Sequence, residues 1–249
     1  MLLFRRIFNF EKAKVVQSEQ RLNQRYSPGA AFPLRATLTL EGKEWPARIQ
    51  NISGNGLGLQ LDRAAAPVEG QSARVRLTLD KHQLDLDARV AHVKATEKGV
   101  YCGLGLTFDD FSVQKGYLQL LQPITIGQTL MAVPGERIVQ NEPQFIKQVY
   151  RGDEGSVLTV WLESKPGTPL HSFEFQMKDY FCKAKMQTGA LEAYQLEAAD
   201  SHTARLTNPV FDTTGGLHDE IRQLFRWIVP NLSKSIPDDV RAVLLGFAA

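Results

Sequence analysis

The chain has 249 residues, of which 43% are hydrophobic and 22% are charged. This composition is that of an ordinary globular protein, and it excludes a disordered, low-complexity or disulfide-rich chain. The length favours two domains over one. The two cysteines, Cys102 and Cys182, are widely spaced, which suits neither a disulfide framework nor a metal site and favours a reducing, cytoplasmic location.

The charge is distributed unevenly along the chain. Residues 1–25 hold six basic and two acidic side chains, whereas the whole chain has a net charge of only +2. A basic arm on a near-neutral body predicts an anionic partner for the arm, with a merely solvated terminus as the alternative for residues 1–15. The apolar start is interrupted by arginines and no stretch approaches about 18 apolar residues, so neither a signal peptide nor a membrane span is expected.

Apolar and polar residues alternate from residue 34 to residue 40, a pattern typical of a half-buried strand. Five further strands are predicted over residues 44–52, 56–61, 75–79, 84–91 and 100–108. A slip in the alternation near the end of the fifth strand predicts a β-bulge. Six short strands favour an antiparallel barrel, or a sandwich, closed by a short helix that begins near Asp109 and ends at Pro123.

The pattern changes again after residue 122. Residues 123–143 contain three prolines and are predicted to be a linker, although residues 124–133 are apolar enough to form a strand. Five strands (145–151, 156–163, 170–177, 179–187 and 190–198) and two helices (216–229 and 238–247) follow. The predicted organisation is therefore mainly β: a basic arm (1–19), a six-stranded barrel (20–122), the linker and an α+β domain (144–249).

Aromatic residues recur in the strands predicted for the C-terminal domain, namely Trp161, Phe173, Phe175, Tyr180 and Phe181. They are expected to fill the core of that domain, with an aromatic docking surface as the alternative.

Two short motifs carry polar groups suited to ligand binding. Residues 21–25 read Arg-x-x-x-Arg immediately before the first strand, and residues 51–56 read Asn-x-Ser-x-x-Gly across the turn from the second strand to the third. Arginine offers a fixed fork of donors that suits a phosphate or the edge of a base. Asn51 and Ser53 are two apart on a strand and are expected to share one face, and Gly56 permits close approach of the backbone.

Together, in this order and in this strand context, the motifs resemble the PilZ family of cyclic di-GMP receptors over residues 20–121. Residues 103–108 also look like the end of the family's last barrel strand. The resemblance implies a cyclic di-GMP site formed by Arg21, Arg25, Asn51, Ser53 and Gly56, with Gln20, Gln24 and Gly54 as secondary candidates. Many relatives have an arginine where this chain has Gln20, and a glutamine cannot neutralise a phosphate, which favours a single bound ligand molecule.

The predicted function is a receptor, not an enzyme. Cyclic di-GMP would order the polar arm over residues 17–30 and so alter the C-terminal domain or its protein partner, which includes self-association. The sequence shows no acid–base constellation, no phosphate-binding loop and no metal-ligand spacing among its histidines, so no cofactor or metal is expected. The resemblance implies a bacterial cytoplasmic role in motility, surface attachment or exopolysaccharide control.

Three other functions remain as alternatives. In one alternative, the chain is an adaptor that binds no ligand and docks onto another protein. In another, the C-terminal domain is an enzyme whose activity the N-terminal barrel controls. A nucleic-acid reader is disfavoured, because the body of the protein is near neutral and has no basic stripe.

Overall fold

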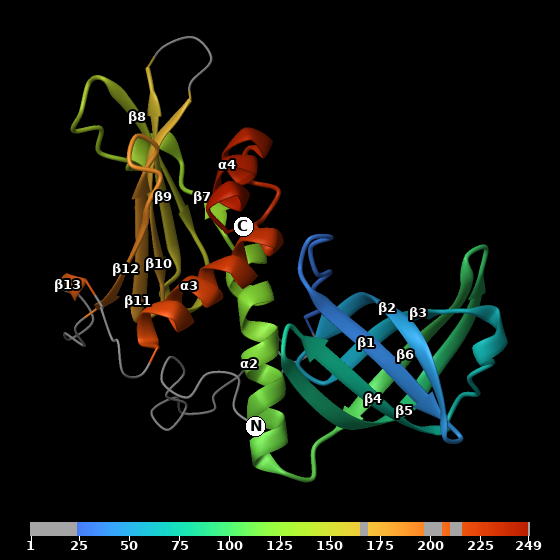
Figure 1. Cartoon of the computed structure of the whole chain (residues 1–249). Helices are drawn as coiled ribbons and strands as arrows, with labels where there is room; N and C mark the ends of the chain where they lie inside the picture. Colours follow the sequence, from blue (N-terminus) through green and yellow to red (C-terminus); the bar gives the residue numbers. More distant parts are fainter. Residues whose placement is uncertain (1–23, 165–168, 197–205, 210–215, 249) are drawn as a thin grey trace. The chain divides into compact units, whose positions relative to one another are not determined.

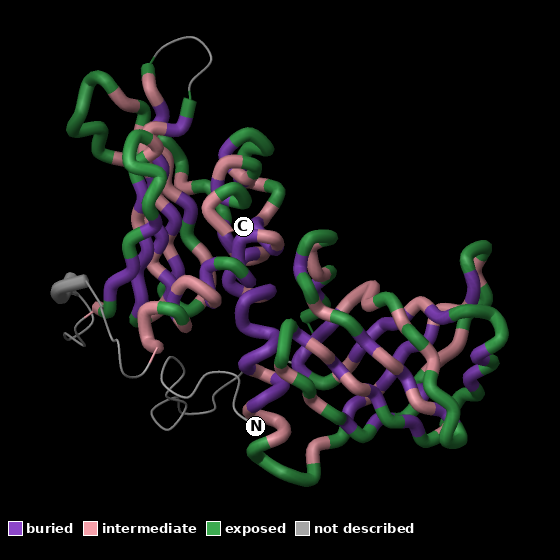
Figure 2. The backbone as a smooth tube through the Cα atoms, in the orientation of Figure 1, coloured by how far each residue is buried: buried purple, intermediate pink, exposed green. Residues whose placement is uncertain are grey.

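The computed structural model describes residues 24–164, 169–196, 206–209 and 216–248. The chain divides into two compact units, Met1–Gln122 and Pro123–Ala249. Figure 1 shows the strands of the first unit in blue to green and those of the second in yellow-green to orange. Each unit has its own set of buried residues, drawn in purple in Figure 2.

The first unit is a closed antiparallel barrel, as predicted. Its strands are β1 (Leu34–Leu40), β2 (Lys43–Ser53), β3 (Gly56–Leu61), β4 (Ser72–Leu79), β5 (His82–Thr96) and β6 (Gly99–Thr107). The strands are joined in the order β1-β2-β3-β6-β5-β4, and a short 3-10 helix, η2 (Arg63–Ala65), follows β3. The alternation of apolar and polar residues therefore located the six strands of this barrel correctly.

The interior of the barrel is filled by the apolar members of the alternating strands. Leu38, Leu59, Val75 and Leu77 are completely buried. Each such side chain stabilises the fold by about 1.5–3 kcal/mol relative to an exposed one. The opposite members of the same strands face outward, so the outer wall of the barrel is free to carry polar and ligand-binding groups.

A β-bulge on β5 confirms the predicted slip in its alternation. The pairing of β5 with β6 shifts between Val90 and His92, so that Val90 lies opposite Leu104 and His92 lies opposite Gly103. Val90 remains buried inside the barrel. The extra residue therefore allows His92 to pair with a glycine of the neighbouring strand on the outer wall.

The helix after the barrel is longer than predicted. The helix α2 spans Phe111–Gln128 and includes Pro123, so the expectation that Pro123 ends it is wrong. Asp110 caps its start, with its carboxylate accepting a hydrogen bond of 2.7 Å from the backbone N–H of Ser112. An interior proline costs about 3 kcal/mol, which the burial of Ile124 and Ile126 beyond it offsets.

The second unit is a seven-stranded antiparallel sheet in which each strand pairs with the next along the chain. The strands are β7 (Met131–Ala132), β8 (Phe145–Arg151), β9 (Val157–Glu163), β10 (Leu170–Met177), β11 (Tyr180–Lys185), β12 (Leu191–Leu196) and β13 (Leu206–Pro209). The five predicted strands are present. The short edge strand β7 lies within residues 124–133, which the sequence allowed as a strand, and the edge strand β13 was not predicted. The residues predicted as a linker thus contain the end of α2, β7 and the 3-10 helix η3 (Gly135–Arg137).

Two helices pack on one face of this sheet. They are α3 (Leu217–Ile228) and α4 (Asp238–Ala248), joined through the 3-10 helix η5 (Val229–Asn231), and a further 3-10 helix, η4 (Asp153–Gly155), connects β8 to β9. The ring of Phe173 on β10 stacks on Phe225 of α3 at 5.7 Å and meets Phe247 of α4 at 5.4 Å. Strands followed by helices confirm the predicted α+β class of this unit.

The described helices include none that combines the length and the apolar composition needed to cross a membrane.

Candidate functional site

The turn between β2 and β3 and the adjoining outer wall of the barrel enclose a cavity of about 450 Å³. Its lining includes Arg25, Asn51, Ser53 and Gly56, which all belong to the two motifs found in the sequence. The volume is within the range of about 300–1,000 Å³ that is usual for small-molecule sites. The structure thus brings together one arginine of the first motif and the three named residues of the second.

The remaining candidates are placed differently. Gln24 is exposed and does not line the cavity, and Gly54 is buried in the turn. Gln20 and Arg21 lie outside the described residues.

Arg25 is held beside the cavity by its neighbour in the chain. Tyr26 forms a bridge with Ile52 through two backbone hydrogen bonds of 2.8 Å, one in each direction. Tyr26 and Phe32 are both buried. The arm predicted over residues 17–30 is thus anchored from Tyr26 onward without a ligand, because the bridge fixes the backbone next to Arg25.

The second motif forms a hydrogen-bonded turn. The side-chain amide of Asn51 donates to the hydroxyl of Tyr101 at 3.1 Å. The Ser53 hydroxyl donates to the side-chain oxygen of Asn55 at 3.2 Å, and Ser53 is only 5% exposed. Asn51 of β2 is therefore oriented on the outer wall by Tyr101 of β6, across the intervening strand β3, whereas Ser53 also maintains the shape of the turn.

Three glycines, Gly56, Gly103 and Gly105, line the cavity, and Gly58 lies next to them beneath the Asn51 and Tyr101 side chains; together they are called the glycine floor. Gly56 lies opposite Gly105, and Gly58 lies opposite Gly103, across the pair of strands β3 and β6. A Cβ atom at Gly103 would overlap the imidazole of His92, and one at Gly58 would come within 2.6 Å of the Asn51 amide. These glycines therefore let side chains lie directly on the backbone of the sheet. Gly105 differs, because a Cβ there would meet no protein atom within 4 Å.

His92 and Tyr101 border the glycine floor and were missed in the sequence. Their rings lie 5.4 Å apart, and His92 lines the cavity. Both come from strands far from the motifs in the chain. The sequence showed the slip in alternation on β5 and the glycines on β6 separately. Taken together with the pairing of β5 and β6, they would have placed His92 beside these glycines.

The charge of the lining favours an anion. Of the described residues around the cavity, Arg25 is a cation and none is a carboxylate. A guanidinium in such surroundings suits a phosphate or the O6 and N7 acceptors of guanine. The described residues contain no group of histidines, cysteines and carboxylates that could hold a metal ion.

The turn also rests on a buried tyrosine of α2. The Tyr117 hydroxyl donates to the backbone carbonyl of Ser53 at 2.6 Å and lies 3.3 Å from that of Gly56. Tyr117 is completely buried, and this burial raises the pKa of its hydroxyl, which therefore stays protonated as a donor. The backbone of the candidate site is thus bonded directly to α2.

Comparison with known proteins gives a family for this part of the chain. Residues 19–124 match the family model described as the PilZ domain, and a search of the curated proteins gives no match. The similar solved structures include the PilZ domain of CeSA from a cellulose-synthesizing bacterium, with 15% identity, a TM-score of 0.32 and coverage of 39% of this chain and 93% of that chain. The PilZ domain of YcgR from Escherichia coli with c-di-GMP has 12% identity, a TM-score of 0.33 and coverage of 39% and 85%.

A third structure extends over most of the chain. The Borreliella burgdorferi PlzA protein in complex with c-di-GMP has 10% identity and a TM-score of 0.31, with coverage of 93% of this chain and 96% of that chain. The family-model match and the six-stranded barrel agree with the resemblance seen in the sequence motifs. Residues 19–124 therefore belong to the PilZ domain family.

Proposed function

We propose that this protein is a cyclic di-GMP receptor whose ligand lies in the cavity beside Arg25, over the glycine floor of β3 and β6. The observation that carries the proposal is the convergence of Arg25, Asn51 and the turn of the second motif on one cavity of a PilZ domain. The ligand named with the similar YcgR and PlzA structures is c-di-GMP. Nothing in the described site suggests catalysis, so the proposed role is binding.

Each side of the cavity suits a different part of the ligand. The guanidinium of Arg25 is suited to bidentate contact with a phosphate or a guanine edge, and Arg21 supplies a second guanidinium in this proposal. The flat floor formed by Gly56 and its neighbours lets a planar base or ribose approach the backbone. Asn51, already oriented by Tyr101, adds a directional amide.

The signal is proposed to leave the site through α2. Ligand contact with the turn changes the position of the Ser53 and Gly56 carbonyls, both of which lie within 3.3 Å of the Tyr117 hydroxyl. The same helix continues to Gln128, beyond the boundary between the units. At that end a Cβ atom on Gly127 would come within 2.7 Å of the backbone oxygen of Asn231, so little displacement of the helix is tolerated there. The second unit then acts on a protein partner or on a second copy of the chain.

The test is calorimetric titration of cyclic di-GMP into the full chain and into single variants. Arg25→Ala removes a charge-assisted contact worth about 1.5–3 kcal/mol, so the affinity should fall by about 10- to 150-fold. Arg21→Ala should weaken binding by a similar factor. Arg74→Ala is the matched control, because Arg74 is an exposed barrel arginine paired with Asp87 at 3.3 Å, outside the cavity lining.

Two results would decide against the proposal. A well-folded wild-type protein that does not bind cyclic di-GMP would leave the ligand-free adaptor as the function to pursue. Equal losses for Arg25→Ala and Arg74→Ala would show that binding depends on overall charge and not on this cavity. If binding is specific, the molar ratio shows whether one or two ligand molecules occupy the site, which tests the effect of Gln20.

A further inference from the structure

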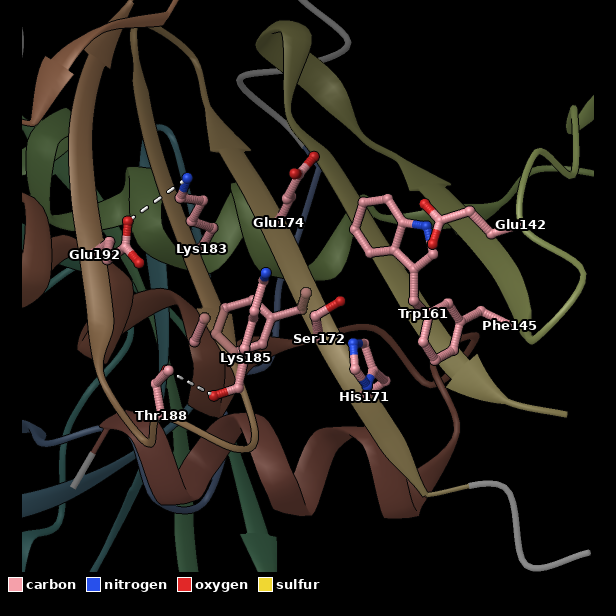
Figure 3. A pocket seen from close by; sticks show the side chains of 12 residues that line it. Glu142, Phe145, Trp161, His171, Ser172, Glu174, Lys183, Lys185, Thr188 and Glu192 are labelled. Atoms are coloured by element: carbon pink, nitrogen blue, oxygen red, sulfur yellow. Dashed lines mark hydrogen bonds and ion pairs between the residues drawn. The ribbon is translucent and has the colours of Figure 1, made fainter. Parts of the chain in front are cut away.

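The sheet of the second unit has a second face that is also shaped for a ligand. Phe173 and Phe175 of β10 point to the helices α3 and α4, and the residues between them point to the opposite face. Figure 1 shows α3 and α4 on one side of this sheet, the side toward which Phe173 points. It is shown from close by in Figure 3.

The strand register places charged and aromatic side chains of this face in adjacent rows. One row crosses four strands through Lys147, Trp161, Ser172 and Lys185. The neighbouring row includes Glu174, Lys183 and Glu192. Directly paired residues of an antiparallel sheet share a face, so these seven side chains form one continuous surface.

A cavity of about 410 Å³ opens on this surface. One side of it is aromatic: the Phe145 ring stacks on the imidazole of His171 at 4.1 Å with an angle of 27° between the planes, and Trp161 stands beside them (Figure 3). Trp161 is only partly buried, so the expectation that it fills the core is wrong. The cavity is as large as ordinary small-molecule sites.

The polar side of the cavity holds groups with spare hydrogen-bonding capacity. Among the described residues, the Trp161 N–H, the Ser172 hydroxyl, the Glu174 carboxylate and the Lys185 ammonium make no side-chain hydrogen bond, although the Lys147 ammonium lies 5.7 Å from the centre of the Trp161 ring and Glu174 is attracted by Lys183 and Lys147. By contrast, Lys183 is paired with Glu192 at 3.6 Å. Burial raises the pKa of the Glu174 carboxyl, and the charges of Lys183 and Lys147 oppose this effect, so the ionised carboxylate has lost part of its hydration.

The charges around the cavity select against ionic ligands. Three carboxylates (Glu142, Glu174 and Glu192) and two lysines (Lys183 and Lys185) line it. The carboxylates disfavour a phosphate or nucleotide, and the lysines disfavour a cation. A neutral ligand avoids both repulsions, and it must offer donors and acceptors to these groups together with an apolar face for the aromatic rings.

We infer that this cavity binds a neutral saccharide. A sugar ring has hydroxyls that donate to Glu174 and accept from Lys185 and the Trp161 indole, and its C–H face packs against an aromatic ring. The inference concerns the second unit alone and does not depend on cyclic di-GMP binding by the barrel.

Ligand-observed NMR on the full chain provides the test, with three neutral hexasaccharides as probes: cellohexaose, maltohexaose and chitohexaose. At least one should show saturation transfer from the protein. Trp161→Ala and Glu174→Gln should each weaken that binding by about tenfold or more, since each removes a stacking face or a charge-assisted hydrogen bond. Trp161→Phe keeps an aromatic face but loses the indole N–H, so it should bind more tightly than Trp161→Ala and less tightly than the wild type, an order that misfolding would not produce.

The matched control is Gln176→Ala, on the same strand and face as Glu174 but outside the cavity lining. It should bind the saccharide as the wild type does. Binding of none of the three probes, or equal binding by Trp161→Ala, would overturn the inference. Preferential binding of guanosine monophosphate or choline would also overturn it, as would a concentration-dependent dimer abolished by Trp161→Ala, which would make the face a protein interface.

Discussion

The substitution Gly105→Ala separates folding of the barrel from ligand binding. Gly105 lies on β6 opposite Gly56 and lines the proposed cyclic di-GMP cavity. Its φ is not in the left-handed region, and an added Cβ would meet no protein atom within 4 Å. The new methyl group therefore projects only into the space proposed for the ligand.

The two effects of this methyl group should have opposite signs. Replacing a glycine in a strand by alanine reduces the freedom of the unfolded chain and should stabilise the barrel by about 0.5–1 kcal/mol. A methyl group inserted into a close-packed contact costs about 1–3 kcal/mol. Since 1.4 kcal/mol corresponds to about tenfold in affinity, cyclic di-GMP should bind about 5- to 150-fold more weakly.

The assay combines urea unfolding, followed by tryptophan fluorescence, with calorimetric titration of the ligand. Gly246→Ala is the matched control, because Gly246 lies in α4 and a Cβ there also meets nothing within 4 Å. It should stabilise the second unit without altering affinity. If Gly105→Ala binds as tightly as the wild type while Arg25→Ala does not, the ligand does not lie over β6 and the reasoning from the glycine floor is refuted.

Three further outcomes are expected. Tyr117→Phe should lower the free energy of unfolding of the barrel by about 1–3 kcal/mol in urea, because the buried carbonyl of Ser53 loses its donor; an unchanged midpoint would contradict this. Burial raises the pKa of Cys102 to about 11 and also raises the pKa of Cys182. Thiol reagents should therefore label each cysteine only when the surrounding structure unfolds locally or globally. Cyclic di-GMP at about 100 times its Kd should slow labelling of Cys102 by up to about 100-fold and that of Cys182 less; no slowing at Cys102 would count against binding to the barrel. The raised pKa of Glu174 means that the folded state holds this proton more tightly than the unfolded state, so stability falls as pH rises above the ordinary carboxyl range. Glu174→Gln should therefore raise Tm at pH 7 and lose that gain in acid; a gain independent of pH would refute the assignment.

The strands were predictable because their signal is local. Leu38 and every second residue on either side of it face the interior of the barrel, so the apolar pattern can be recognised within a few consecutive residues. The strands β7 and β13 are too short to show a period, and the pairing of their edges depends on the rest of the sheet. The same contrast holds at the sites. Asn51 and Ser53 share a short motif, whereas His92 reaches the cavity through a bulge, and Trp161 faces outward because its neighbours on β9 take the core.

Pro123 shows why the structure of the segment that connects the units could not be predicted from its local sequence. A proline usually ends a helix, since it lacks the N–H and its ring crowds the preceding turn. Here the residues on both sides of it are buried: Tyr117 and Leu120 before it, and Ile124 and Ile126 after it. Their combined burial outweighs a penalty of about 3 kcal/mol, because each contributes about 1.5–3 kcal/mol. One consequence bears on the proposed relay. If the helix ended at Pro123, Tyr117 would lie in its last turns and an irregular segment would follow. The helix instead continues from Tyr117 past Gln122, where the first unit ends, to Gln128, and the proposed relay depends on this continuity.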